Sequence, residues 1–167
     1  MNYTLTVDGI ELRVLKRFGL VIPDYYVSKC AKVWSSKRNK WKSVFENWRQ
    51  KKGQGKPKCM DFSVTTPAQP FRDLGMQYTK KSSTRDTAEF RVKVHQAVKT
   101  VWHPLEDYSH EIGITKEQWD QAPQPFKQLA YDTVLIDHID DNIKNNHLDN
   151  LQYSTPLRNS NYRKLWK

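Results

Sequence analysis

The chain has 167 residues, with 28 Lys and Arg against 18 Asp and Glu, which gives a formal net charge of +10 and a sequence pI near 9.6. Its hydrophobic content of 37% argues against wholesale disorder, and its length allows one or two small domains. Without an apolar N-terminal run, we expect a cytoplasmic protein with no membrane partner. The two cysteines, Cys30 and Cys59, have no Cys-x-x-Cys partner, which argues against a structural zinc site.

The positive charge is concentrated in the front of the chain. Residues 1–94 hold 20 Lys and Arg against 8 Asp and Glu, a balance of +12, whereas residues 95–167 hold 8 against 10, a balance of −2. This asymmetry favours a polyanion partner over a general solubilising charge. The densest basic run holds the residues that we expect to contact DNA phosphates: Lys32, Lys37, Arg38, Lys40, Lys42, Arg49, Lys51, Lys52, Lys56 and Lys58.

The first 60 residues are predicted to form two hairpins, a helix and a loop. Asp8-Gly9 between two apolar runs is a strong hairpin signal, and a second pair of strands is expected at about 25–36. Within 39–50, apolar side chains recur at i, i+3, i+4 and i+7, which predicts a helix. Residues 51–58 lack an apolar period and are predicted to be a flexible loop that orders on DNA. The helical stripe consists of Trp41, Val44, Phe45 and Trp48.

The middle of the chain is less regular. A strand is expected at 88–94, followed by a helix whose apolar stripe is Val94, Val98, Val101 and Trp102. His95 borders this stripe, so it is interpreted either as a satisfied, partly buried histidine or as a functional one. Between 103 and 131, Thr115-Lys-Glu-Gln118 has the capping-box pattern that begins a short helix.

Residues 133–166 predict a strand, a loop, a second strand and a helix. The β-branched, apolar run at 133–139 suits a strand, the loop that follows is rich in Asp and Asn, and 150–155 suits a partner strand. Thr155 is expected to cap a helix over 157–166, with Pro156 at its first position. A helix N-terminus presents free N–H groups, so a phosphate can bind there.

This layout contains the types of residue that hydrolysis of a phosphodiester bond requires, a general base and ligands for a metal ion. A neutral imidazole at His138 can take a proton from water near pH 7 if its other nitrogen is held, and Asn150 could hold it directly or through its backbone. Asp137 and Asn159 offer the hard oxygen ligands that suit Mg²⁺ or Mn²⁺. Neighbouring strand residues point to opposite faces, so Asp137 and His138 can share a site only if the strand ends or bulges there.

Three stretches carry a family resemblance. Asp137-His138, Asp140, Asn145-Asn146, Asn150-Leu151 and Asn159 resemble, in type and separation, the HNH homing endonucleases of the ββα-metal or His-Me finger class, particularly the phage-intron type. Residues 24–36 look like the N-terminal hairpin module common in these enzymes, except that Ala31 stands where the family usually has Gly. Residues 90–98 are similar to the family's Val-His segment and include His95.

The resemblance implies roles for these residues. Asp137 and Asn159 would bind one Mg²⁺ or Mn²⁺ ion per active site, with His138 as the general base and Asn150 orienting it. His95, Asn146 and Asp140 would be supporting residues. The enzyme would leave 5′-phosphate and 3′-hydroxyl ends, and for a phage-encoded protein the compartment would be the host cytoplasm.

The expected fold is α+β, with a β-rich, basic N-terminal DNA-binding region and a C-terminal ββα-metal finger. We expect a DNA-binding module at 1–60, connecting strands and basic loops at 61–94, and an HNH nuclease domain at 95–167 with its finger at 133–167. The expected function is site-preferring endonuclease action on double-stranded DNA, without an obligatory protein partner. Two alternatives stay open, a non-catalytic DNA-binding protein with a degenerate finger and an RNA-binding protein.

Overall fold

The computed structural model describes residues 3–17, 20–48, 58–73, 79–80 and 86–165. It has a mixed fold in which the strands form antiparallel pairs within three separate sheets. Helices and strands do not alternate as in parallel α/β folds, which is consistent with the expected α+β class. The predicted basic loop at 51–58 lies outside the described residues except for Lys58, as do Arg49 and the basic residues of 81–85.

The first sheet is a five-stranded antiparallel meander. Asp8 and Gly9 both have positive φ, 50° and 74°, as a tight two-residue hairpin turn requires, so the first predicted hairpin is confirmed. The second predicted hairpin is confirmed as well, and Ala31 in its turn takes the left-handed conformation at φ 65°. In order across the sheet the strands are β1 (Thr4–Val7), β2 (Ile10–Arg17), β3 (Leu20–Val27), β4 (Val33–Ser35) and β5 (Lys40–Trp41).

The helix predicted over 39–50 is wrong. Asn39 is in a left-handed turn, β5 pairs with β4, and 45–47 forms a strand of another sheet. Trp41 packs edge-on against Trp34 and donates its indole N–H to Asp8 Oδ2 at 3.1 Å, whereas Val44 packs against the main core. Trp41 and Val44 therefore belong to β5 and to the segment before 45–47, which pack against different clusters, and tertiary packing overrode the helical period.

The second sheet contains the strands of the middle of the chain. Its order is β6 (Phe45–Asn47), β7 (Cys59–Pro67), β9 (Thr87–Lys93) and β8 (Thr79–Lys80), and a short helix, α1 (Gln69–Asp73), follows β7. β9 confirms the strand predicted at 88–94. β7 was not predicted, although Met60, Phe62 and Val64 alternate with polar residues, which is a strand signal.

The central helix α2 (Val94–Trp102) joins the sheets to the C-terminal elements. It contacts β2, β7 and β9 on one side and β10 (Leu135–His138), η2 (Leu148–Asn150) and β11 (Leu151–Ser154) on the other. The main core includes side chains from both sheets, α2, η2 and β11. One continuous core therefore runs through segments at 1–60, 61–94 and 95–167.

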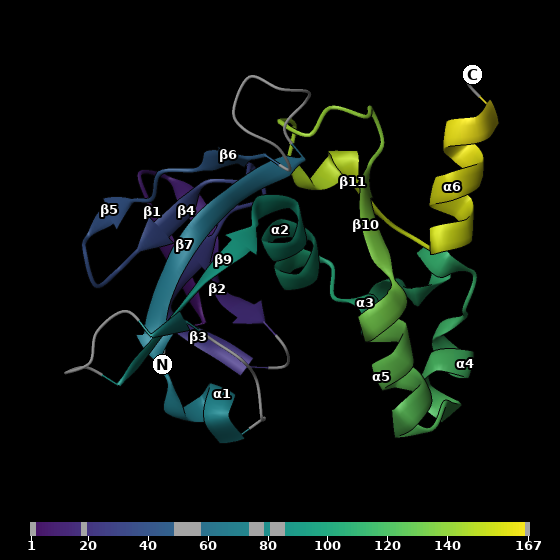
Figure 1. Ribbon diagram of the computed structural model, residues 1–167, viewed down its shortest axis with the longest axis horizontal. Coiled ribbons are helices and arrows are strands. Elements are labelled where there is room, and N and C mark those ends of the chain that lie inside the picture. Colours follow the sequence, from purple (N-terminus) through teal and green to yellow (C-terminus); the bar gives the residue numbers. More distant parts are fainter. Residues whose placement is uncertain (1–2, 18–19, 49–57, 74–78, 81–85, 166–167) are drawn as a thin grey trace.

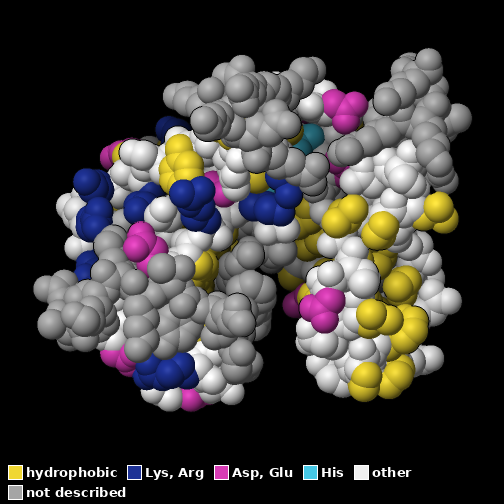
Figure 2. Space-filling view, in the orientation of Figure 1, with side chains coloured by type: hydrophobic (Ala, Val, Ile, Leu, Met, Phe, Trp, Pro, Cys, Tyr) yellow, Lys and Arg dark blue, Asp and Glu magenta, His cyan; other side chains and the backbone are white. Residues whose placement is uncertain are grey.

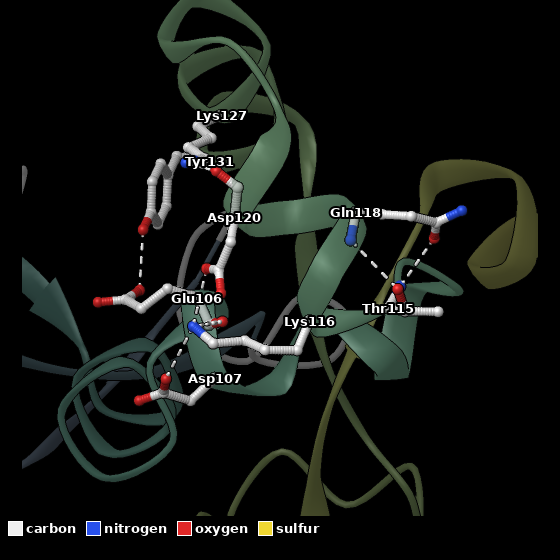
Figure 3. Close-up of polar contacts among 8 residues, drawn as sticks. All are labelled: Glu106, Asp107, Thr115, Lys116, Gln118, Asp120, Lys127 and Tyr131. Atoms are coloured by element: carbon white, nitrogen blue, oxygen red, sulfur yellow. Dashed lines mark hydrogen bonds and ion pairs between the residues drawn. The ribbon is translucent and has the colours of Figure 1, made fainter.

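The segment between 103 and 134 is mostly helical and shares a small core with Tyr153 of β11 and Ile136 of β10. It contains α3 (Leu105–Tyr108), η1 (Ser109–Ile112), α4 (Lys116–Gln121) and α5 (Gln124–Thr133). Thr115 and Gln118 exchange the reciprocal bonds of the predicted capping box at the start of α4 (Figure 3). Lys116 Nζ lies 3.4 Å from Asp107 and 3.1 Å from Asp120, so its charge is already paired.

The chain ends in the predicted order of strand, loop, strand and helix. β10 and β11 form a two-stranded antiparallel sheet, and α6 (Pro156–Leu165) follows β11. Figure 1 shows the two larger sheets on one side of α2 and α3 to α6 on the other. Within the described residues, no helix has both the length and the apolar character needed to cross a bilayer.

Candidate active site

His138 is the last residue of β10, and Asp137 precedes it. Ile139 N donates to Asn150 O at 2.9 Å, so the antiparallel alternation turns the His138 N–H away from β11. That N–H faces the free edge of the two-stranded sheet, where it donates to Asp137 Oδ1 at 3.2 Å. The strand end predicted as a condition for a shared site is therefore present, and the Asp137 carboxylate turns toward the His138 backbone.

The imidazole of His138 is held by Asn146. Its Nε2 lies 3.0 Å from Asn146 Oδ1, while Asn146 Nδ2 donates to the carbonyls of Ile143 and Lys144 at 3.1 and 3.3 Å. Flipping the amide would bring its oxygen against two carbonyl oxygens, so Oδ1 must face the ring. His138 therefore carries its proton on Nε2, and Nδ1 keeps a lone pair that can accept a proton.

Asn150 has a different role from the expected direct contact, because no bond joins its side chain to His138 within the described residues. Its Oδ1 accepts from Asp140 N at 3.1 Å, and its Nδ2 donates to Asp140 Oδ1 and to Asn145 O at 2.8 and 2.7 Å. Through its backbone carbonyl Asn150 also binds Ile139, next to His138. Asn150 thus fixes the loop that carries Asn146, and within the described residues neither its side chain nor its backbone binds the imidazole, which Asn146 holds instead.

Asp140 is the acceptor at the centre of this loop. Its carboxylate accepts from Asn145 Nδ2 at 2.8 Å, from the backbone N–H of Asn142 at 2.8 Å and from Asn150. These bonds, with that from Asn145 first, lower the pKa of Asp140 below its ordinary value because they favour the charged form. The supporting position expected for Asp140 is structural, since it closes the loop between β10 and η2.

His95 lies beside His138. It is in the first turn of α2, its residue is 8% exposed, and its ring centroid is 5.1 Å from that of His138 with the planes at 68°. Burial, then the neighbouring His138 and then Lys93 lower the pKa of His95 to about 3. No described group bonds its Nδ1. His95 is therefore buried and neutral but not satisfied, which matches neither of the two interpretations in full.

Asp137 and Asn159 are the expected metal ligands. Asp137 is half-buried and has no cationic partner among the described residues, so its carboxylate keeps lone pairs for a ligand. Asn159 is half-buried in the first turns of α6, where Thr155 Oγ1 accepts from Arg158 N at 3.3 Å and confirms the predicted cap. No hydrogen bond joins the Asp137 and Asn159 side chains. As a donor set, one carboxylate and one amide oxygen fit a hard divalent ion.

A buried ion pair that was not predicted binds the backbone of β11 in the two-stranded sheet of β10 and β11. Lys99, 1% exposed, donates to Glu111 Oε1 at 2.7 Å and to Leu151 O at 2.9 Å, while Glu111 Oε2 accepts from Tyr153 N at 2.6 Å. These bonds join α2, η1 and β11. A lysine next to the apolar stripe of α2 was the available sequence signal, but its partners lie 12 and 52 residues away.

Several of the expected DNA-binding residues are exposed on the sheets. Lys32, Lys37, Arg38, Lys40 and Lys58 are exposed and Lys42 is half-exposed. Two of them lie over aromatic rings, Lys32 over Trp41 at 5.5 Å and Lys42 over Tyr25 at 5.7 Å. Figure 2 shows Lys and Arg side chains gathered on the part of the surface formed by the sheets. The remaining members, Arg49, Lys51, Lys52 and Lys56, lie outside the described residues.

Comparison with known proteins adds no family assignment. No protein-family model, no curated protein and no solved structure matches the chain.

Proposed function

We propose that this protein is a divalent-metal-dependent DNA endonuclease of the HNH homing type, with a ββα-metal finger at 133–167. The observation that carries the proposal is the state of His138. Asn146 accepts from the protonated Nε2, so Nδ1 keeps its lone pair and bonds no described group, while the Asp137 carboxylate accepts from the His138 backbone N–H at the end of the strand. A general base requires a fixed tautomer and a lone pair that water can reach, and His138 keeps 8% of its surface exposed.

The proposed reaction is hydrolysis of a phosphodiester bond. His138 Nδ1 takes the proton from the attacking water, and Asn146 stabilises the imidazolium that results by accepting from Nε2. Asp137 and Asn159 would hold a magnesium or manganese ion, whose charge stabilises the negative charge that develops on the leaving oxygen. Asn150 and Asp140 keep the loop in place, so the base does not have to be positioned anew in each turnover.

The proposed substrate is double-stranded DNA, held mainly by the sheets. The +12 balance of residues 1–94 supports this assignment, as do the exposed cations of the turn between β4 and β5. The cation–aromatic contacts of Lys32 and Lys42 restrict these side chains before DNA binds, which lowers the entropy lost on binding.

The test is incubation of the full chain with supercoiled plasmid and with RNA, in Mg²⁺ or Mn²⁺ and in EDTA. We expect nicked or linear plasmid with 5′-phosphate ends in either metal and no cleavage in EDTA. DNA binding without cleavage would support the degenerate-finger alternative, and tighter binding to RNA than to duplex DNA would support the RNA-binding alternative. Sequencing the ends of cleaved genomic DNA would then define the preferred site.

A further inference from the structure

A second histidine, His95, packs against the ring of His138. His95 comes from α2, a helix that packs on both larger sheets and on the hairpin, so its position does not depend on the loop that carries Asn146. The two rings meet edge to face, 5.1 Å apart at 68°, an arrangement that aromatic pairs prefer.

One hydrogen bond does not fix the plane of an imidazole. The bond from Nε2 to Asn146 Oδ1 sets one point of the His138 ring, about which the ring could still tilt. The buried His95 ring fills the space into which such a tilt would move it. The bond to Asn146 and the packing against His95 together define both the position and the plane of the His138 ring. They therefore also set the direction of its Nδ1 lone pair.

We propose that His95 is a positioning residue, whose ring packs against His138 and aims the Nδ1 of His138 at the attacking water. This inference rests on the proposed function of His138. The role belongs to the shape of the ring, because its Nδ1 bonds no described group. The low pKa of His95, caused mainly by burial, keeps the ring uncharged wherever the nuclease would be assayed, so it does not repel the imidazolium formed at His138.

The experiment compares two variants. His95→Ala removes the ring that packs against His138, whereas His95→Phe keeps an aromatic ring and lacks both nitrogens. Thr100→Ala is the matched control, because Thr100 is exposed on the same helix. We expect His95→Ala to lower kcat by roughly 10- to 100-fold with little change in the Kd for DNA, as misplacement of a reacting group does. His95→Phe should recover most of that loss, and Thr100→Ala should behave as the parent.

A His95→Phe variant that is folded, binds DNA and is as slow as His95→Ala would overturn the proposal, since the nitrogens would then be required. Parent-like kcat in His95→Ala would overturn it as well. If His95→Ala does not fold, as judged by thermal unfolding, His95→Leu replaces it, because leucine fills a similar volume without a flat ring.

A spectroscopic readout separates this inference from the proposed function. Imidazole ¹⁵N signals distinguish the two tautomers, and we expect His138 of the parent and of His95→Phe to show the Nε2–H form alone. In His95→Ala the bond to Asn146 should keep this tautomer, while ¹⁵N relaxation of the His138 imidazole should show added motion of the ring about that bond. Unchanged relaxation of the His138 imidazole in that variant would overturn the positioning role even if the parent cleaves no DNA, whereas added ring motion without cleavage would support the positioning and refute only the nuclease function.

Discussion

The sheets and the C-terminal elements differ in charge and in the way their polar side chains are held. The sheets carry the positive excess, and several of their cations lie over aromatic rings with their charged ends at the surface. In the C-terminal part, carboxylates bind Lys99 and Lys116. The side-chain amide of Asn150 donates to the carbonyl of Asn145 in the loop between β10 and η2. The described cations of the turn between β4 and β5 therefore stay exposed at the surface, whereas Lys99 and Lys116 are bound within the C-terminal part.

The two regions meet at a few specific bonds as well as through the core. Leu148 N donates to Lys29 O at 2.9 Å, Lys144 Nζ lies 2.8 Å from Glu46, and the Trp102 indole donates to Val27 O at 3.1 Å. These bonds keep the hairpin in a set position relative to the sheets. On the proposed function, DNA held by the sheets would therefore meet His138 in a set register, and affinity and rate should be separable by mutation.

The largest effect is expected from His138→Ala. Loss of the general base should lower the cleavage rate by roughly 10² to 10⁴, while DNA affinity stays close to that of the parent because the sheets are unchanged. Single-turnover cleavage and binding measured in EDTA give the two quantities. A variant that cuts at the parent's rate would refute the assigned base, and one that loses DNA binding would break the separation of the two regions.

Asp137→Ala should act in the same region through the metal. The variant loses the charged ligand of the proposed pair, so cleavage should be reduced at every Mg²⁺ or Mn²⁺ concentration and should not recover fully at high metal. Asp149→Ala is a suitable control, because Asp149 is an exposed carboxylate of the same region whose partner is His147. Equal activity in the parent and Asp137→Ala would remove Asp137 from the site.

The complementary change is made on the sheets. Substituting Gln for Lys37 and Arg38 removes two exposed cations, and each lost phosphate contact should lower the slope of log affinity against log salt by about 0.9. The matched control substitutes Gln for Lys116 and Lys127, which already bind Asp120 through its carboxylate and its carbonyl. Both pairs are compared in the His138→Ala background. Equal salt slopes for the two variants would show that DNA is bound elsewhere.

The pH dependence of stability sharpens the description of the C-terminal region. His95 titrates near 3 when folded and near 6.5 when unfolded, so the unfolded chain binds the proton first as the pH falls. This histidine therefore lowers the free energy of unfolding between pH 6.5 and about 3 and has no such effect above pH 6.5. We expect urea unfolding to show a smaller acid loss for His95→Phe, by about 1–2 kcal/mol at pH 5. Parallel pH profiles for the two chains would contradict the buried, neutral state of His95.

The smallest effect is expected in the turn between β3 and β4. Ala31 has a φ of 65°, a left-handed conformation that costs a residue with a Cβ more than it costs glycine. Ala31→Gly should raise the free energy of unfolding by about 0.5–1 kcal/mol and leave cleavage and binding unchanged. Thermal unfolding measures the gain. A destabilised Ala31→Gly would show that the methyl group contributes more through packing than the backbone conformation costs.

Elements with local signals were predictable from the sequence. The Asp8-Gly9 turn, the capping box at Thr115, and the Thr155 cap with Pro156 behind it all depend on residues within a few positions of each other. The helix over 39–50 failed because Trp41 and Val44 are recruited by different clusters, which spacing along the chain does not encode.

The candidate site was predictable in its residues but not in its bonds. Asn145, Asn146 and Asn150 have the same amide chemistry, and only the path of the loop decides which of them reaches His138. The contact between His95 and His138 joins residues 43 positions apart and required the packing of α2. The role of Lys99 was hidden for the same reason, since Glu111 and Leu151 O are brought to it by the fold.

The bonds of Lys99 limit how the protein can be divided. Its ammonium group is satisfied only when residues from α2, η1 and β11 are all present, and removing one partner of a buried ion pair typically costs about 3–5 kcal/mol. Dividing the chain between Lys99 and Glu111 would incur this cost, whereas a fragment that starts at residue 133 would lack both and would leave Leu151 O and Tyr153 N without these partners. The smallest excisable unit therefore begins at or before α2, and a chain split between η1 and β10 should regain its hairpin only when both halves are mixed.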